Sequence, residues 1–77
     1  MSDIEHKVKW LVSEHFRVDI DTLTPETDFV NDLGADSLDS IELILQVELD
    51  YEVEITDNEI DSCHTIKDVV ELVNNKV

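Results

Sequence analysis

One stretch marks the point where a long loop ends and a central helix begins: Asp32-Leu33-Gly34-Ala35-Asp36-Ser37-Leu38-Asp39-Ser40-Ile41-Glu42-Leu43. Gly34 is the only glycine of the chain. It indicates a tight turn or a close backbone approach, because glycine tolerates the left-handed backbone conformation. Asp36 is a typical N-cap residue, whose side chain accepts a hydrogen bond from a free backbone N–H. The stretch therefore predicts a helix over about 37–51.

Apolar side chains occupy two opposite faces of this predicted helix, at 100° per residue. The first stripe consists of Leu43, Ile44, Val47 and Tyr51. The second stripe consists of Leu38, Ile41, Leu45 and Leu49, flanked by Glu42, Glu48 and Glu52. A small bundle needs only one apolar face per helix. The second stripe indicates either a helix buried on both sides or an exposed docking surface, and we expect the docking surface.

The first helix is expected over about 3–16. Ser2 and Glu5 form a capping-box pattern at its start. An apolar stripe at helical spacing follows: Ile4, Val8, Leu11, Val12 and Phe16. Thr24-Pro25 then predicts one short helical turn, with proline at the first helical position. The rest of this long connection is expected to be anchored by Phe29, Val30 and Leu33.

Two further capping boxes predict the remaining helices: Thr56 with Glu59, and Thr65 with Asp68. The first opens a short helix near 57–62, and the second opens a last helix over about 66–75. Strand patterns are weak, since only Val53-Glu54-Ile55 alternates. The predicted fold is therefore an all-α, small four-helix bundle, with three principal helices, one short helix and a long loop between the first two.

Length and composition limit the class of protein. A chain of 77 residues supports one domain, over 1–77, and its 42% hydrophobic content suits a lean globular core. No apolar run approaches the roughly 18 residues of a membrane span, and the acidic start is unlike a signal peptide. One cysteine excludes an internal disulfide and a cysteine-rich zinc site. We expect a cytoplasmic protein, with an organelle matrix as the alternative if a transit peptide was removed.

The charge is strongly negative, with 20 acidic against five basic residues and a net charge of −15. The basic residues all lie near the two ends: Lys7, Lys9, Arg17, Lys67 and Lys76. From Val18 to Ile66 there are fifteen acids and no Lys or Arg. Such a surface repels nucleic acid and anionic membranes and attracts basic protein partners. We also expect crowding to raise carboxyl pKa values, so that stability increases as the pH falls from neutral.

The run around Gly34-Ala35-Asp36-Ser37-Leu38-Asp39 closely resembles the carrier-site motif of acyl carrier proteins of the fatty-acid-synthase type. The resemblance covers nearly the whole chain, through its length, its acidity, its helix pattern and Glu54-Ile55 before the short helix. It implies a four-helix bundle with 4′-phosphopantetheine attached to Ser37. A separate transferase would move this group from coenzyme A, and the thiol of the arm would carry acyl chains as thioesters.

The residues around Ser37 agree with that implication. A helix N-terminus accommodates a phosphodiester, because its N–H groups are unpaired and the helix dipole is positive there. No base lies near Ser37 in the sequence, so its hydroxyl is a substrate that another enzyme must activate. The resemblance suggests that Asp36 helps to organise a divalent metal in the transferase complex, besides capping the helix. The chain itself is expected to have no catalytic residue and no resident metal.

The expected partners are the phosphopantetheinyl transferase and acyl-processing enzymes with basic docking patches, acting on a monomer. The residues expected to contact them are Asp36, Leu38, Ile41, Glu42, Leu45 and Glu48. The expected pathway is fatty acid biosynthesis. The alternatives are a specialised carrier for a polyketide or lipid-modification pathway, and an acidic helical adaptor without a prosthetic group.

Several other residues are of types that often form functional sites. Cys63-His64 lacks a third ligand or an oxyanion site, so we expect Cys63 to be a small buried hydrophobe near the arm. His6 and His15 are expected to be solvated helix positions. Trp10 lies off the first apolar stripe, and we expect partial burial against the loop rather than contact with a partner. Relatives often have glycine after the first helix and an acid at the place of Leu49, whereas this chain has Phe16-Arg17 and a leucine.

Overall fold

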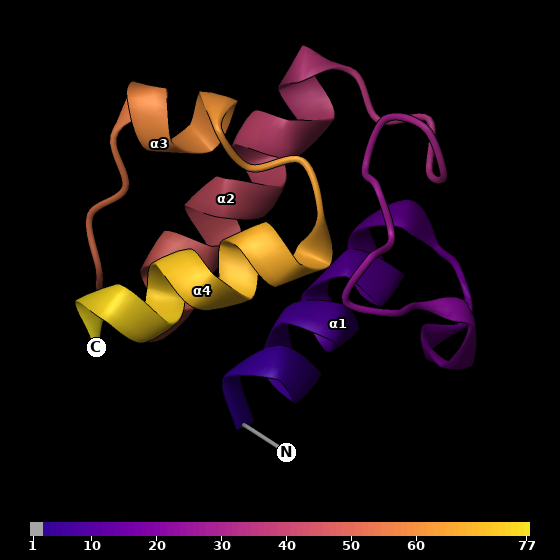
Figure 1. The fold of residues 1–77 in the computed structure, drawn as a ribbon, viewed down its shortest axis with the longest axis horizontal. Helices are drawn as coiled ribbons and strands as arrows, with labels where there is room; N and C mark the ends of the chain where they lie inside the picture. Colours follow the sequence, from indigo (N-terminus) through magenta and orange to yellow (C-terminus); the bar gives the residue numbers. More distant parts are fainter. Residues whose placement is uncertain (1–2) are drawn as a thin grey trace.

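The computed structural model describes residues 3–77, in which four α-helices surround one core (Figure 1). The elements are α1 (Asp3–Phe16), the short 3-10 helix η1 (Ile20–Thr22), α2 (Ser37–Tyr51), α3 (Asp57–Asp61) and α4 (Ile66–Lys76). Within the described residues there is no strand, and the only β-type pairing is an isolated bridge between Asp28 and Thr65. The predicted small helical bundle with a long loop after α1 is confirmed.

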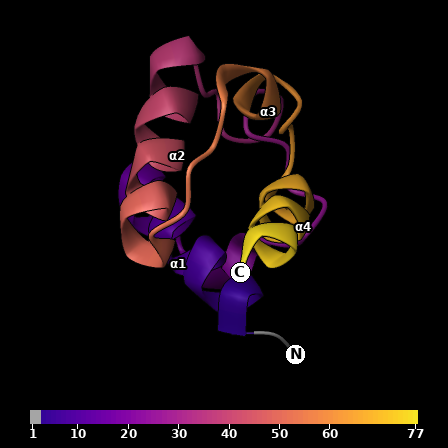
Figure 2. The same ribbon diagram turned by 90° about the vertical axis from the view of Figure 1, so that its left-hand side faces the viewer.

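The helices form a ring rather than parallel layers. Helix α1 packs against both α4 and α2, and α2 also contacts α3. Seen from the side, α2 and α4 stand opposite each other, with α1 below and α3 above (Figure 2). No helix among residues 3–77 is long and apolar enough to cross a membrane.

Local hydrogen bonds set three of the helix starts. The predicted capping boxes at Thr56 and Thr65 both form, and the predicted N-cap Asp36 forms a capping box as well, each with the acidic residue three positions later. At α2, Asp39 N–H donates to Asp36 Oδ1 at 2.9 Å, and Asp36 N–H donates to Asp39 Oδ2 at 3.2 Å. The predicted cap of α1 by Ser2 lies outside the described residues.

The core takes one apolar face from each long helix, three side chains from the long loop and one, Ile55, from the segment between α2 and α3. Its buried members are Val8, Leu11, Val12, Leu23, Phe29, Ala35, Leu43, Ile44, Val47, Ile55, Ile66, Val69 and Val73. Phe29 anchors the loop as predicted, and Leu33 is half-buried. Val30 does not anchor the loop as predicted, because it is 59% exposed. Phe29 fills the core position here, which leaves the next side chain outside.

The loop corrects a second expectation. The predicted helical turn at Thr24-Pro25 is only a hydrogen-bonded turn, closed by Thr27 N–H to Thr24 O at 3.0 Å and by Thr24 N–H to Thr27 Oγ1 at 2.9 Å. The single turn of helix lies earlier, at η1, where Asp19 accepts a hydrogen bond from Asp21 N–H. Thr27 supplies the side-chain acceptor that ends the turn, so the chain does not continue as a helix.

Helix α1 ends at Phe16 even though no glycine follows it. Arg17 adopts a left-handed backbone conformation with φ 56°. Val18 N–H then donates to Ser13 O at 3.1 Å, and Ser13 Oγ donates to Val18 O at 2.6 Å. These bonds satisfy groups that a helix end otherwise leaves free. The predicted end at residue 16 is therefore correct without the usual glycine.

The loop is joined to the start of α4 by three backbone hydrogen bonds. Phe29 N–H donates to His64 O at 2.9 Å, Ile66 N–H to Thr27 O at 3.2 Å and Lys67 N–H to Pro25 O at 2.8 Å. At the far end of the loop, Gly34 adopts φ 68°, and a Cβ placed on it would meet no atom within 4 Å. Of the two expectations for Gly34, the tight turn is therefore correct and the close approach is not. The loop holds the α3–α4 connection beside the start of α2.

Candidate functional site

Ser37 is the first residue of α2, and its side chain is exposed. Within residues 3–77 its hydroxyl makes no hydrogen bond, and the N–H groups of Ser37 and Leu38 have no acceptor. The start of α4 differs, because loop carbonyls occupy the N–H groups of Ile66 and Lys67. The beginning of α2 therefore offers a free hydroxyl together with two free donors at the positive end of the helix dipole.

A hollow of about 380 Å³ opens beside this serine. Its lining comes from the loop, from α2 and from the α3–α4 region: Val30, Ala35, Asp36, Ser37, Ser40, Ile41, Ile60, Asp61, Cys63 and His64. These segments are distant in the sequence, and the loop contacts to residues 64–67 bring them together. The hollow is thus a consequence of the fold rather than of one motif.

Cys63 and His64 both line this hollow. Burial raises the pKa of the Cys63 thiol to about 11, with a further contribution from Asp68 and Glu59. The thiol therefore stays protonated at neutral pH and is a poor nucleophile. Cys63 is half-buried, in line with the expected small hydrophobe, and His64 is exposed. No hydrogen bond joins Ser37 Oγ to His64 or to any other base of the described chain.

His15 contradicts the expectation of a solvated position. It is half-buried, and its Nε2 lies 3.3 Å from Asp39 Oδ1 on α2. The pKa of Asp39 is lowered, first by the hydrogen bond from Asp36 N–H and second by His15. His15 thus connects the end of α1 to the Asp36–Asp39 capping box, whose two residues lie on either side of Ser37 in the sequence. His6 is exposed as expected.

The two stripes of α2 have different environments. Leu43, Ile44 and Val47 are buried, and Tyr51 is half-buried. The second stripe is exposed, with Leu38 at 62%, Ile41 at 42%, Leu45 at 50% and Leu49 at 73%. The alternative of a helix buried on both sides is therefore wrong. Contiguous exposed apolar side chains on a small domain indicate an interaction surface.

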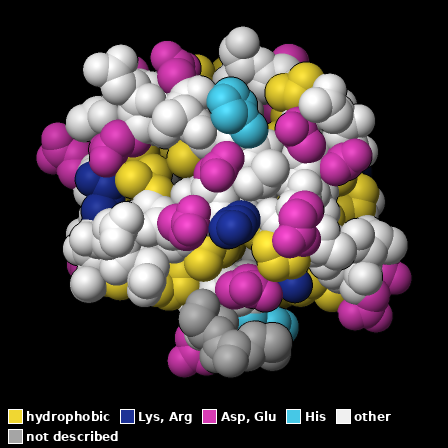
Figure 3. Space-filling model, in the orientation of Figure 1, with side chains coloured by type: hydrophobic (Ala, Val, Ile, Leu, Met, Phe, Trp, Pro, Cys, Tyr) yellow, Lys and Arg dark blue, Asp and Glu magenta, His cyan; other side chains and the backbone are white. Residues whose placement is uncertain are grey.

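The acids along that stripe are not equivalent. Glu42 is exposed and has no partner among residues 3–77. Glu48 is half-buried and accepts a hydrogen bond from Ile55 N–H at 2.9 Å, so it also holds the segment that leads into α3. Acidic side chains are also scattered over the face that carries α4, with fewer basic ones between them (Figure 3). The described residues hold no group of three His, Cys, Asp or Glu side chains suited to a metal ion.

The expected rise of carboxyl pKa values is wrong for four groups. The pKa values of Asp28, Asp39, Glu59 and Asp68 are all lowered, and in each case a backbone N–H bond is the largest cause. These hydrogen bonds stabilise the charged form and outweigh the desolvation that raises each pKa. Local capping geometry therefore matters more for these groups than net charge.

Trp10 is partly buried, as expected, with 46% of its surface exposed. It lines a hollow between α1 and α2. Sequence analysis did not find this second hollow. A signal was present, since Lys7, Trp10 and Glu14 recur at spacings of three and four and therefore share one face of α1.

Comparison with known proteins agrees with this geometry. The sequence pattern of a family described as "Phosphopantetheine attachment site" matches residues 6–73. An acyl carrier protein of Thermosynechococcus vestitus is 46% identical over 76 residues, which cover 99% of this chain and 94% of the relative. The chain therefore belongs to the acyl carrier protein family, as the carrier motif predicted.

Membership implies a 4′-phosphopantetheine prosthetic group. The start of α2 fits such a group, because it combines an exposed, unbonded serine hydroxyl with two free N–H donors for the phosphodiester oxygens. The adjacent hollow gives the first part of an arm a surface to lie against. The chain's own residues thus meet the chemical demands of the group.

Proposed function

We propose that residues 1–77 form a single acyl carrier domain that carries acyl chains as thioesters on 4′-phosphopantetheine attached to Ser37. The domain would deliver these chains between enzymes of fatty acid biosynthesis, as a cytoplasmic monomer. The observation that supports the attachment site best is the free Ser37 hydroxyl beside two unpaired N–H groups at the start of α2. When bound, the group supplies a terminal thiol on a flexible arm.

Ser37 acts as a substrate rather than as a catalyst in this proposal. During loading, Ser37 Oγ forms a bond to phosphorus, the pyrophosphate bond of coenzyme A breaks, and adenosine 3′,5′-bisphosphate leaves. The serine proton must pass to a base of the transferase, because no base of the described chain bonds to Ser37 Oγ. The free N–H groups of Ser37 and Leu38 would hold the phosphodiester once it is attached, because the positive end of the helix dipole favours its charge. The chain itself therefore needs no catalytic activity.

The exposed stripe of α2 would be the surface that partner enzymes contact. Leu38, Ile41 and Leu45 supply apolar area beside Ser37, and Asp36, Glu42 and Glu48 supply negative charge for basic residues of the transferase or of acyl-processing enzymes. Charges at the rim of such an interface mainly speed association. Since Glu48 also bonds Ile55 N–H, charge reversal at Glu42 is the cleaner test of this role.

The attachment site is tested by intact-protein mass spectrometry after incubation with coenzyme A and a phosphopantetheinyl transferase. We expect the mass increase of one phosphopantetheine on the native chain and none on Ser37→Ala. The matched control is Ser40→Ala, which removes a hydroxyl from the same hollow one turn further along α2 and should still be loaded. Circular dichroism should show unchanged helicity for both variants, because neither serine side chain caps a helix. A group found on Ser40 or Ser62 would overturn the assignment.

A second candidate is a carrier dedicated to a specialised pathway, such as polyketide synthesis or lipid modification. It is favoured by Leu49, which is 73% exposed where relatives often have an acid. A longer apolar stripe with less charge would suit a different set of partners. A competition assay between Leu49→Glu and the native chain for binding to a fatty-acid-synthesis enzyme tests this candidate. Tighter binding of the variant would support it, because the native leucine would then disfavour a fatty-acid-synthesis partner.

A further inference from the structure

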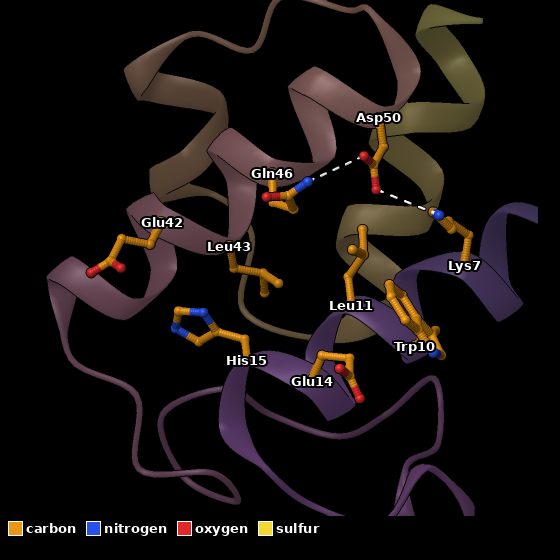
Figure 4. Close-up of a pocket in the computed structure, with 9 residues that line it drawn as sticks. All are labelled: Lys7, Trp10, Leu11, Glu14, His15, Glu42, Leu43, Gln46 and Asp50. Atoms are coloured by element: carbon orange, nitrogen blue, oxygen red, sulfur yellow. Dashed lines mark hydrogen bonds and ion pairs between the residues drawn. The ribbon is translucent and has the colours of Figure 1, made fainter.

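A second concave surface lies between α1 and α2, and it shares no lining residue with the hollow beside Ser37. We call it the Trp10 groove; it measures about 620 Å³ and is shown in Figure 4. Its lining residues from α1 are Lys7, Trp10, Leu11, Glu14 and His15, and those from α2 are Glu42, Leu43, Gln46 and Asp50. Leu11 and Leu43 are buried and form an apolar floor.

The two walls of the groove are tied together at both ends. Lys7 Nζ lies 3.6 Å from Asp50 Oδ2, and Gln46 Nε2 donates to Asp50 Oδ1 at 3.2 Å (Figure 4). At the other end, His15 pairs with Asp39 at 3.3 Å. The Lys7–Asp50 and His15–Asp39 pairs join α1 to α2, whereas the Gln46–Asp50 bond lies within α2. The groove is present in the free protein, so a ligand would not need to order it first.

Trp10 and Glu14 make the α1 wall suitable for a cation with an apolar neighbour. They lie four residues apart on one helix, so their side chains stand on the same face. Trp10 is 46% exposed, and its ring already has Lys7 Nζ at 5.1 Å from its centroid. Glu14 is exposed and has no partner within residues 3–77. An arginine can lie flat against an aromatic ring and pair with a carboxylate at the same time.

The charges around the groove favour a cationic occupant over a neutral one. Lys7 is neutralised by Asp50, whereas Glu14 on α1 and Glu42 on α2 border the groove without counter-ions in the described chain. The surroundings add to this potential, because no Lys or Arg occurs between Val18 and Ile66. An anionic or purely apolar ligand would leave both glutamates unpaired.

We propose that the Trp10 groove binds a segment of a partner protein that presents an arginine beside apolar side chains. The guanidinium lies against the Trp10 ring and pairs with Glu14, and the apolar side chains contact the leucine floor. Glu42 borders both this groove and the exposed stripe of α2, so a partner could contact the two surfaces together. The proposal does not depend on any group attached to Ser37.

Fluorescence of Trp10 provides a direct test, because it is the only tryptophan of the chain. The probe is the acetylated, amidated peptide Leu-Arg-Leu-Arg, titrated into the full chain at low salt. We expect a saturable change in Trp10 emission that weakens as salt is added. The same peptide with lysine in place of arginine should bind more weakly, since an ammonium group cannot stack on the indole ring or form a bidentate pair.

Two variants, each lacking one negative charge, distinguish binding in the Trp10 groove from general electrostatic attraction to an acidic protein. Glu14→Gln should weaken peptide binding roughly threefold, as expected for the loss of one partly exposed ion pair. Glu71→Gln removes an exposed acid of α4 and should leave binding unchanged. Thermal melts of both variants should match the native melt. Ser37→Ala should bind the peptide normally, so a failed loading experiment and a failed groove experiment remain distinguishable.

Three results would overturn the proposal. The first is a linear, unsaturable change in emission, and the second is an equal loss of affinity in Glu14→Gln and Glu71→Gln. The third is equal affinity for the arginine and lysine peptides, because it would show attraction by charge alone. Amide chemical shifts provide an independent readout, and changes spread over the whole acidic surface, rather than centred on Trp10 and Glu14, would also contradict the groove.

Discussion

Arg17 holds a backbone conformation that glycine adopts without strain. Its φ of 56° lies in the left-handed region, and its side chain is exposed with no partner within residues 3–77. The left-handed conformation costs an L-residue with a Cβ about 1–2 kcal/mol. Glycine at this position also gains freedom in the unfolded chain, which offsets part of that amount. We therefore expect Arg17→Gly to raise the free energy of unfolding by up to about 1 kcal/mol.

Urea denaturation of Arg17→Gly beside Arg17→Ala checks this expectation. Alanine removes the arginine side chain but keeps the Cβ, so Arg17→Ala should give no comparable increase in the free energy of unfolding. Equal stabilisation by both substitutions would mean that loss of the side chain, rather than backbone relief, is the cause. The same reasoning extends to Glu52, which ends α2 with φ 53°.

At the scale of elements, two isoleucines of α2 offer a matched comparison. Ile44 is 2% exposed, whereas Ile41 lies on the opposite stripe and is 42% exposed. Ile44→Ala should lower the free energy of unfolding by roughly 2–5 kcal/mol, because it leaves a cavity in the core. Ile41→Ala should cost less, about 1 kcal/mol in the free protein, since much of its side chain is already exposed to water and its loss leaves no closed cavity.

Thermal melts of these two variants, together with a partner-binding assay, distinguish core from docking surface. Ile41→Ala should mainly speed dissociation of the transferase complex if Ile41 is an apolar anchor there. Equal destabilisation of the free fold by both substitutions would place the exposed stripe in the core. Partner binding that is unchanged by Ile41→Ala would move the docking surface away from this stripe.

Sequence information was sufficient for elements whose causes are local. The capping boxes at Asp36, Thr56 and Thr65 each act across three residues. The starts predicted for the three helices that follow them are all correct. The periodic stripes also separated the buried face of α2 from its exposed face. The helical turn was misplaced because Thr24-Pro25 fits a helix start as well as it fits the turn that Thr27 closes.

Features formed between distant residues had no such local cause. His15 and Asp39 are 24 residues apart, and nothing near either residue in the sequence indicates the pair. The position of Trp10 depends on how α1 crosses α2, which helical periodicity does not give. At the candidate attachment site, the sequence placed Ser37 and its cap, whereas the hollow that includes Cys63 and His64 required the fold.

For the molecule as a whole, acid should unfold the protein rather than stabilise it. The lowered pKa values of Asp28, Asp39, Glu59 and Asp68 mean that these groups bind fewer protons in the folded state than in the unfolded state. Their contribution to stability is complete above their ordinary pKa values and is lost as the pH falls through the folded values. The ordinary values are 3.8 for the aspartates and 4.5 for the glutamate.

Urea midpoints measured between pH 7 and pH 3 test this prediction. We expect the free energy of unfolding to fall below about pH 4.5 as these caps become protonated. Asp68→Asn should reduce the acid dependence, because it removes the charge that accepts the N–H bonds of His64 and Thr65. A midpoint that rises steadily down to pH 3 would show that repulsion among the acids outweighs the caps.

The backbone bonds between the loop and α4 also have a consequence for solvent exchange. First-turn amides of a helix usually exchange with deuterium quickly, because they lack intrahelical acceptors. Those of Ile66 and Lys67 donate to loop carbonyls, and Phe29 N–H donates to His64 O, so all three should exchange slowly. Ser37 and Leu38, at the start of α2, should exchange quickly. Two helix starts in one small protein would then differ in protection, and the exposed one would be the start where we propose that the prosthetic group attaches.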